Sequence, residues 1–227
     1  MKARPILFSG PMIRALLSGA KTQTRRVVKL QPEDVFAHEV ASYSQATGAT
    51  VHYPKDATAT VFSDGLWYSL GPSAAGPIAC PYGQPGDVLW VRETWSRAKL
   101  YPASHEMFYR ADGDVLGRQL SLSYVEREKC WRPSIHMPRW ASRLTLRITD
   151  VRVERVQEIS EDDAIAEGVD TITMADVARQ AAWSRRQDFS RLWDSINGQR
   201  AGCSWADNPW CWCLTFDVIQ QNVDELT

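Results

Sequence analysis

Hydrophobic positions first recur with helical spacing near the start of the chain. A short apolar run at 4–9 predicts a strand, and Met12, Ile13, Leu16 and Leu17 then fall on one face of a helix. This face is apolar while the positions between are polar or small, so the helix is expected to pack against a core.

The ends of this helix are marked by residues with known preferences. Ser9 suits the N-cap position, and Pro11 is tolerated in the first turn, where its missing N–H is not needed. Gly19 suits the left-handed conformation that closes a helix. Valines at 27–28 then favour a strand, so the chain is expected to turn sharply at 20–22.

Three later stretches are predicted to be strands. Residues 88–95 follow a turn signal at 82–87, and residues 210–219 predict a closing strand. Apolar and polar residues alternate over 144–156, but the apolar parity changes at 149–150. An extra residue at that point would restore the pattern, so we expect a β-bulge there.

Two further helices are predicted downstream. Ser160, with Asp163 three residues later, is a typical N-cap pair, and Gly168 is placed to end this short helix. Apolar residues between 188 and 197 recur at i, i+3, i+4 and i+7, which predicts an amphipathic helix over 188–197.

Strands separated by single helices predict an α+β fold, built as a small mixed β-barrel flanked by short helices. Residues at about 31–79 are rich in Ala, Thr, Ser, Gly and Pro, which predicts a peripheral insertion of hairpins and loops. No internal linker is evident, so we expect a single domain over 1–227.

Composition narrows the possible partners. The net charge of −1 provides no global attraction to nucleic acid, so any RNA contact would have to be local. The chain has ten Trp, several next to Arg, most densely in the irregular segment 131–142. Indole and guanidinium planes can stack on bases, but for most of these Trp we expect a packing role.

The five cysteines form no tight disulfide framework, and no apolar run is long enough to cross a membrane. A cytoplasmic location is therefore expected. Cys211 and Cys213 lie in an apolar run, and the four His are scattered without zinc-ligand spacing. We expect these cysteines in the core, with no metal and no other cofactor.

Candidate chemistry is densest after the first helix. Lys21, Thr24, Arg25 and Arg26 place an amine, a hydroxyl and two guanidinium groups within six residues. Lys21 and Thr24 would point to opposite faces of one continuous strand, so they converge only if the strand begins after Lys21. A solvated basic turn that binds nothing explains the same residues equally well.

Three stretches, at 18–26, 86–91 and 159–168, resemble the ASCH domain family of the PUA-like superfamily. Together with 92–95 and the Trp-rich segment, the chain looks like the longer ASCH proteins of phages. The order and spacing match over the whole chain apart from the insertion. The resemblance implies a PUA-like β-barrel.

The resemblance also implies an activity. Small bacterial ASCH proteins are amidohydrolases that convert N4-acetylcytidine to cytidine and acetate. Their proposed catalytic Lys, Thr and Glu match Lys21, Thr24 and Glu167 of this chain. The expected function is therefore metal-independent hydrolysis of the exocyclic amide of N4-acetylcytidine, or of a related N4-acylated cytosine nucleoside, with this small molecule as the partner.

Other ASCH-like proteins are reported or proposed to bind RNA or act on it. An RNA-binding or RNA-cleaving module is therefore the alternative function, and a non-catalytic accessory of phage packaging is a weaker third. The sequence indicates neither the acyl-group preference nor the oligomeric state.

Two assignments of the catalytic roles are open. In the first, a neutral Lys21 takes the proton of Thr24, and a protonated Glu167 serves the leaving nitrogen. In the second, a cationic Lys21 holds the oxyanion, and Glu167 activates Thr24 or a water molecule. The non-catalytic alternative is a structural ion pair between Lys21 and Glu167.

Four residues are candidate substrate contacts. Arg25 and Arg26 adjoin the catalytic positions. Glu93 ends an apolar strand face and could contact a substrate amino or hydroxyl group, although a structural strand-end carboxylate is the commoner case. Trp95 is a candidate stacking platform for a base.

Overall fold

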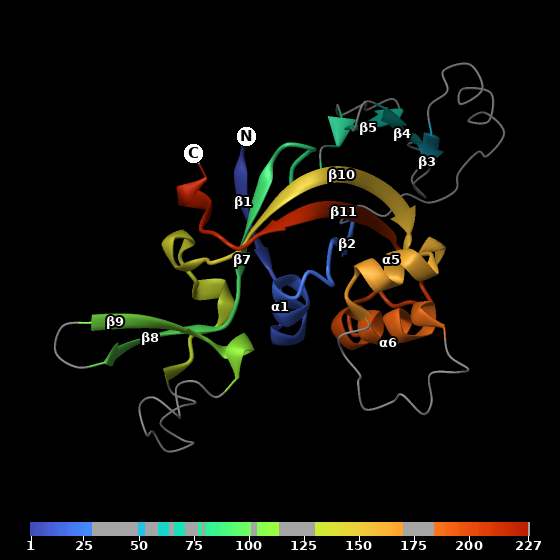
Figure 1. Cartoon of the computed structure of the whole chain (residues 1–227). Helices are drawn as coiled ribbons and strands as arrows, with labels where there is room; N and C mark the ends of the chain where they lie inside the picture. Colours follow the sequence, from blue (N-terminus) through green and yellow to red (C-terminus); the bar gives the residue numbers. More distant parts are fainter. Residues whose placement is uncertain are drawn as a thin grey trace.

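The computed structural model describes residues 1–28, 50–52, 59–63, 66–70, 77–78, 80–100, 104–113, 130–169 and 184–226. In this part of the chain the predicted α+β class is confirmed. A five-stranded mixed sheet carries the core, a four-stranded sheet and a two-stranded hairpin stand beside it, and short helices flank it (Figure 1).

The five-stranded sheet combines strands from both ends of the chain. The pair at the edge that contains the first strand of the chain is parallel, and the other three pairs are antiparallel. In spatial order its strands are β1 (Ala3–Leu7), β7 (Val88–Arg92), β10 (Thr145–Arg155), β11 (Trp210–Ile219) and β2 (Gln23–Val27). Strands β1 and β2 are its edges, and no pairing among the described residues joins them into a closed barrel.

Strands β10 and β11 form a long curved ribbon through the sheet (Figure 1). Their register shifts between Ile148 and Asp150, which confirms the predicted bulge. Leu146 and Ile148 before the shift and Val151 after it are all buried. The extra residue therefore keeps both halves of β10 pointing their apolar side chains into the core.

Helix α1 (Gly10–Leu17) packs its predicted apolar face against this sheet. Ile13 and Leu16 are completely buried in the main core cluster. Complete burial of such side chains stabilises the fold by roughly 1.5–3 kcal/mol each. Ser9 takes the N-cap position, and Gly19 has φ of 75°, so both predicted helix ends are confirmed.

Helices α5 (Glu161–Ala166) and α6 (Arg185–Asn197) pack together over a second core cluster. The Ser160 side chain accepts a hydrogen bond from the Asp163 N–H, as its predicted capping role requires. Helix α6 begins three residues before the predicted 188, because Ser184 caps it by accepting from the Gln187 N–H.

The predicted strand 88–95 is wrong at its end. Strand β7 stops at Arg92, and Trp95 opens a new strand, β8 (Trp95–Leu100), which pairs with β9 (Ser104–Tyr109). The backbone N–H of Glu93 meets the Met137 sulfur at 3.2 Å instead of a ladder partner. Glu93 therefore sits at a strand break.

Short 3₁₀ turns complete the described structure. Segment 131–142 is irregular as predicted, but Met137 is completely buried whereas Trp140 is 54% exposed. The turns are η1 (Arg110–Asp112), η2 (Ser134–His136), η3 (Arg139–Ala141), η4 (Val156–Glu158) and η8 (Val223–Glu225).

The described residues of the predicted insertion form a separate antiparallel sheet. Its strands are β3 (Thr50–His52), β4 (Ala59–Ser63), β5 (Leu66–Leu70) and β6 (Pro77–Ile78), in that order. The hairpins expected there are thus present. The other residues of 31–79 lie outside the described part of the chain. The single-domain organisation stays a prediction.

Candidate functional site

The turn after α1 is held against the end of α5. The Lys21 N–H donates to the Ala15 carbonyl, and the Thr22 N–H donates to the Ala166 carbonyl. Lys21 and Glu167 form an isolated antiparallel bridge. Strand β2 then begins at Gln23, after Lys21. The side chains of Lys21 and Thr24 can point to the same side only if the strand begins there.

Lys21 and Glu167 form a buried ion pair. The Lys21 Nζ donates to both the Oε2 and the backbone carbonyl of Glu167, each at 2.8 Å. The two side chains are 0% and 4% exposed. Burial lowers the pKa of Lys21, and the Glu167 carboxylate opposes this shift. The predicted catalytic pair is therefore brought into direct contact.

Gly168 allows this contact because it has no side chain. Its φ is 85°, and a Cβ there would lie 3.0 Å from the Ala15 Cβ and 3.1 Å from the Lys21 Cβ. The left-handed turn that ends α5 thus lets the chain pass closely behind Lys21. This gives a physical reason for the glycine beyond ending a helix.

Arg25 is the centre of an internal charge network. Its guanidinium donates to Gln23 Oε1 at 2.7 Å, Glu154 Oε2 at 2.9 Å and Asp163 Oδ2 at 2.8 Å. It is 4% exposed, and its Nη1 lies 3.6 Å from Glu167 Oε1. Partial burial alone would raise the pKa of Asp163, but the hydrogen bonds from Arg25 and Gln23, together with the charges of Arg25 and Arg152, outweigh it and lower that pKa.

The second oxygen of Glu167 has no hydrogen-bond donor among the described residues. This Oε1 atom is buried, and the Arg25 Nη1, at 3.6 Å, is beyond hydrogen-bond distance. Buried carboxylate oxygens are nearly always hydrogen-bonded in proteins. An unsatisfied oxygen of this kind is suited to a donor from outside the protein.

Glu167 and Thr24 both line a cavity of about 460 Å³. Lys21 is not among the lining residues, so it lies behind Glu167. One wall is an apolar face of α6, and aromatic residues close other sides. The remaining lining residues are Met12, Arg25, Arg26, Val27, Val28, Pro81, Tyr82, Phe189, Leu192, Trp193, Ile196, Asn197, Arg200 and Trp212.

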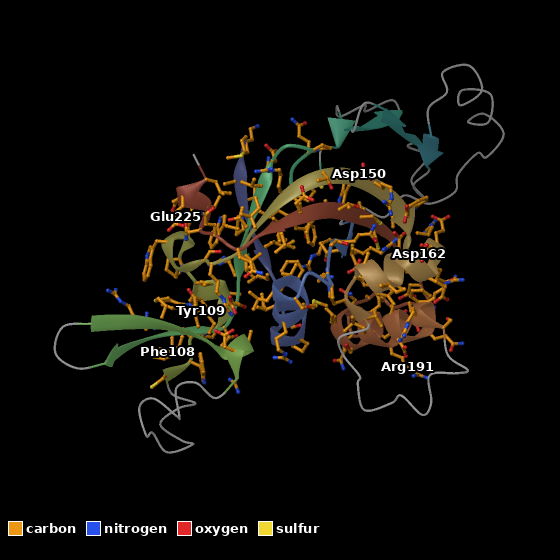
Figure 2. The ribbon with its side chains drawn as sticks, viewed as in Figure 1. Phe108, Tyr109, Asp150, Asp162, Arg191 and Glu225 are labelled. Carbon is orange, nitrogen blue, oxygen red and sulfur yellow. The ribbon has the colours of Figure 1, made fainter. Side chains whose placement is uncertain are left out.

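Glu93 does not line this cavity. It is buried and forms a two-pronged ion pair with Arg143, at 2.9 and 3.1 Å, and Arg143 also binds Asp112. The Arg143 guanidinium stacks 4.0 Å from the centre of the Tyr109 ring, on β9 (Figure 2). Burial raises the pKa of Glu93, with Arg143 opposing it. Glu93 lines a separate cavity of about 290 Å³ beside Arg14.

Trp95 does not line the first cavity either. It is 2% exposed and packs in its own cluster with Met137 and Ala141. Its ring is 6.1 Å from that of Trp140, centre to centre in a T-shaped arrangement, and the Arg132 guanidinium lies 5.1 Å from its centre. The indole that was predicted as a stacking platform is therefore covered by protein.

The sequence did not single out the wall that α6 provides. The apolar spacing predicted only an amphipathic helix over 188–197, and core and cavity faces have the same helical spacing. Arg200, three residues beyond the helix, also lines the cavity. A basic residue continuing an apolar stripe was the only available signal.

No protein-family model, curated protein or solved structure matches this chain. Within the described residues, no helix combines the length and apolar character needed to cross a bilayer. In the same part of the chain, no cluster of three or more His, Cys, Asp and Glu side chains is placed to hold a metal ion.

Proposed function

We propose that this chain hydrolyses the exocyclic amide of N4-acylated cytosine nucleosides, with N4-acetylcytidine as the reference substrate. The observation that supports it most is the buried, unsatisfied Oε1 of Glu167, since Glu167 and Thr24 line the same cavity. A carboxylate beside a hydroxyl is the minimum that acyl transfer to the protein requires.

The proposal includes a PUA-like fold. Its support is the curl of the five-stranded sheet, whose two edge strands approach each other. Arg26 on β2 donates from Nη2 to the Leu7 carbonyl on β1 at 2.8 Å, and its guanidinium lies 5.0 Å from the centre of the Phe8 ring. A side chain thus bridges the edges that a closed barrel would join by backbone pairing.

In the proposed reaction, Glu167 accepts the Thr24 hydroxyl proton as Thr24 Oγ1 attacks the acyl carbon. The C–N bond then breaks, and Glu167 returns the proton to the departing cytosine amine. Water hydrolyses the Thr24 ester, again with Glu167 as base, and releases the carboxylic acid.

Lys21 fits the cationic version of the mechanism better than the basic one. Its Nζ donates both observed hydrogen bonds to Glu167 oxygens, and it does not line the cavity. From this position it orients Glu167 and supplies positive charge to the site. Arg26, which does line the cavity, can hold the developing oxyanion.

The direct test is an ultraviolet assay of N4-acetylcytidine hydrolysis by the wild-type protein in the presence of EDTA. We expect release of cytidine that EDTA does not slow. Loss of activity with EDTA would contradict the metal-independent chemistry, and no turnover of N4-acetylcytidine or of longer acyl derivatives would contradict the proposal as a whole.

RNA binding is the second candidate function, and one surface favours it. Trp140 is 54% exposed, and the Arg97 guanidinium lies 5.5 Å from the centre of its ring. Ile135 is also exposed, at 56%, and Arg132 is exposed nearby. Exposed indole and guanidinium groups in one area suit stacking on single-stranded bases.

A gel-shift titration with single-stranded RNA tests this surface. Arg97→Gln should weaken binding, whereas Arg191→Gln on α6, labelled in Figure 2, removes the same charge elsewhere and should not. Equal binding by both variants, or binding that salt does not weaken, would count against this candidate.

A further inference from the structure

Charge in the first cavity is unbalanced. Its lining contains three arginines, Arg25, Arg26 and Arg200, but a single carboxylate, Glu167. That carboxylate is already paired with Lys21 at 2.8 Å. A ligand that carries negative charge would restore the balance.

The three arginines are not equivalent. Arg25 is engaged by carboxylates of its own, Glu154 and Asp163. Arg26 donates to the Leu7 carbonyl, while its buried Nε has no hydrogen-bond partner among the described residues. Arg26 therefore retains a donor that a ligand could use.

Arg200 is exposed and has more donors left. Among the described residues its hydrogen bond is a long one, 3.5 Å from Nη1 to Asn197 Oδ1, and no carboxylate lies within 4.0 Å. A guanidinium presents several N–H groups in a fixed fork that matches the oxygens of a phosphate. Most of the Arg200 fork has no hydrogen-bond acceptor among the described residues, and Arg200 lines the cavity.

Arg200 lies at one end of the apolar wall that α6 provides. Phe189, Trp193 and Ile196 line the cavity as one apolar stripe, and Arg200 continues the same spacing past the helix end. At 1.5 Å per residue the stripe alone is roughly 10 Å long. A base can lie along this wall with a charged group at the Arg200 end.

We propose that the substrate is a phosphorylated N4-acylcytidine and that Arg200 binds its phosphate. This rests on the proposed amidohydrolase function and deepens it. The ribose phosphate can belong to a free nucleotide or to an RNA chain, since both present the same group.

Kinetics on three substrates test the inference: N4-acetylcytidine, its 5′-monophosphate, and a short oligonucleotide containing one N4-acetylcytidine. Because a hydrogen bond to a charged group contributes about 1.5–3 kcal/mol, the wild-type kcat/KM should be roughly ten- to a hundredfold higher with a phosphate. Which phosphorylated substrate is preferred identifies the source of the group.

The preference should depend on Arg200. Arg200→Gln should lower the ratio of the two kcat/KM values, phosphorylated over unphosphorylated, by about tenfold or more, and Arg200→Lys should restore part of it. Arg191→Gln removes the same charge from the same helix outside the cavity and should leave the ratio unchanged. An equal kcat/KM for all substrates, or an undiminished ratio in Arg200→Gln, would overturn the inference.

Calorimetry separates this inference from the proposed reaction. If no substrate is hydrolysed, the amidohydrolase proposal fails, and binding of cytidine 5′-monophosphate is then compared with binding of cytidine. Tighter binding of the monophosphate that Arg200→Gln abolishes would still support the phosphate site. Equal affinities, or no binding of either compound, would overturn it.

Discussion

Replacing Lys21 with Met tests whether the buried pair is a true ion pair. Met has a similar length and no charge, so Lys21→Met removes the donor that Glu167 Oε2 meets at 2.8 Å and leaves the packing largely intact. The Glu167 carboxylate, 4% exposed, would then keep Arg25 as its ion-pair partner among the described residues, with Nη1 3.6 Å from Oε1.

The expected cost follows from this burial. Removing one partner of a buried pair costs about 3–5 kcal/mol, because the other charge is left without compensation. For a chain of this length each kcal/mol lowers the melting temperature by roughly 2–4 °C, so a fall of roughly 6–20 °C is expected. Urea unfolding near neutral pH, followed by Trp fluorescence, gives the free energy directly.

A second substitution checks the cause. Adding Glu167→Gln to Lys21→Met removes the stranded charge, so the double variant should be more stable than Lys21→Met alone. This strong non-additivity is the signature of a coupled pair. A loss of unfolding free energy below about 1 kcal/mol in Lys21→Met would show that the two side chains are not a strongly coupled ion pair. A double variant no more stable than Lys21→Met would show the same.

Four further predictions concern neighbouring groups. Because folding lowers the pKa of Asp163, its carboxylate stabilises the fold at neutral pH, and this stabilisation is lost as the pH falls below the pKa of the unfolded state. The difference in unfolding free energy between wild type and Asp163→Asn should therefore shrink when urea titrations are repeated in acid. A difference that stays constant with pH would contradict this. Gly168→Ala should destabilise the fold by about 1–3 kcal/mol in the same assay, and a neutral result would contradict the strain argument. Thr24→Ala should lower kcat by about 10²-fold or more without a matching loss of melting temperature, while Thr24→Ser keeps part of the activity. Lys21→Arg should retain measurable kcat if Lys21 acts as a cation, since Arg cannot serve as a base; complete loss of kcat in a folded variant would favour the basic role.

Local features of the site could be predicted from the sequence because short-range sterics determine them. Gly19 and Gly168 both adopt the expected positive φ, and Ser160 caps its helix. The bulge in β10 followed from a change of apolar parity, which any strand with one buried face must correct. The contact between Lys21 and Glu167 followed from motif matching alone.

Long-range partners were beyond such reasoning. Arg25 was expected to contact substrate, which stays a prediction because it lines the cavity. Its ion pairs with Glu154 and Asp163, which are 129 and 138 residues away in the chain, were not foreseen. No local pattern encodes which carboxylates a buried guanidinium will meet. Glu93 was a candidate because it ends an apolar strand face, and Trp95 because its indole could stack on a base. The strand break after Arg92 places Glu93 against Arg143 and Trp95 at the start of β8, and neither lines the first cavity.

The most direct test of the proposed function is kcat for N4-acetylcytidine in wild type and Glu167→Gln, measured with the melting temperature of each. We expect turnover by the wild type and a fall of about 10²-fold or more in Glu167→Gln, because the amide cannot accept the Thr24 proton. A fall in kcat that exceeds any loss of folded protein would support the catalytic assignment. Wild-type kcat in folded Glu167→Gln, with only the melting temperature lowered, would show that Lys21 and Glu167 form a structural pair and would contradict it.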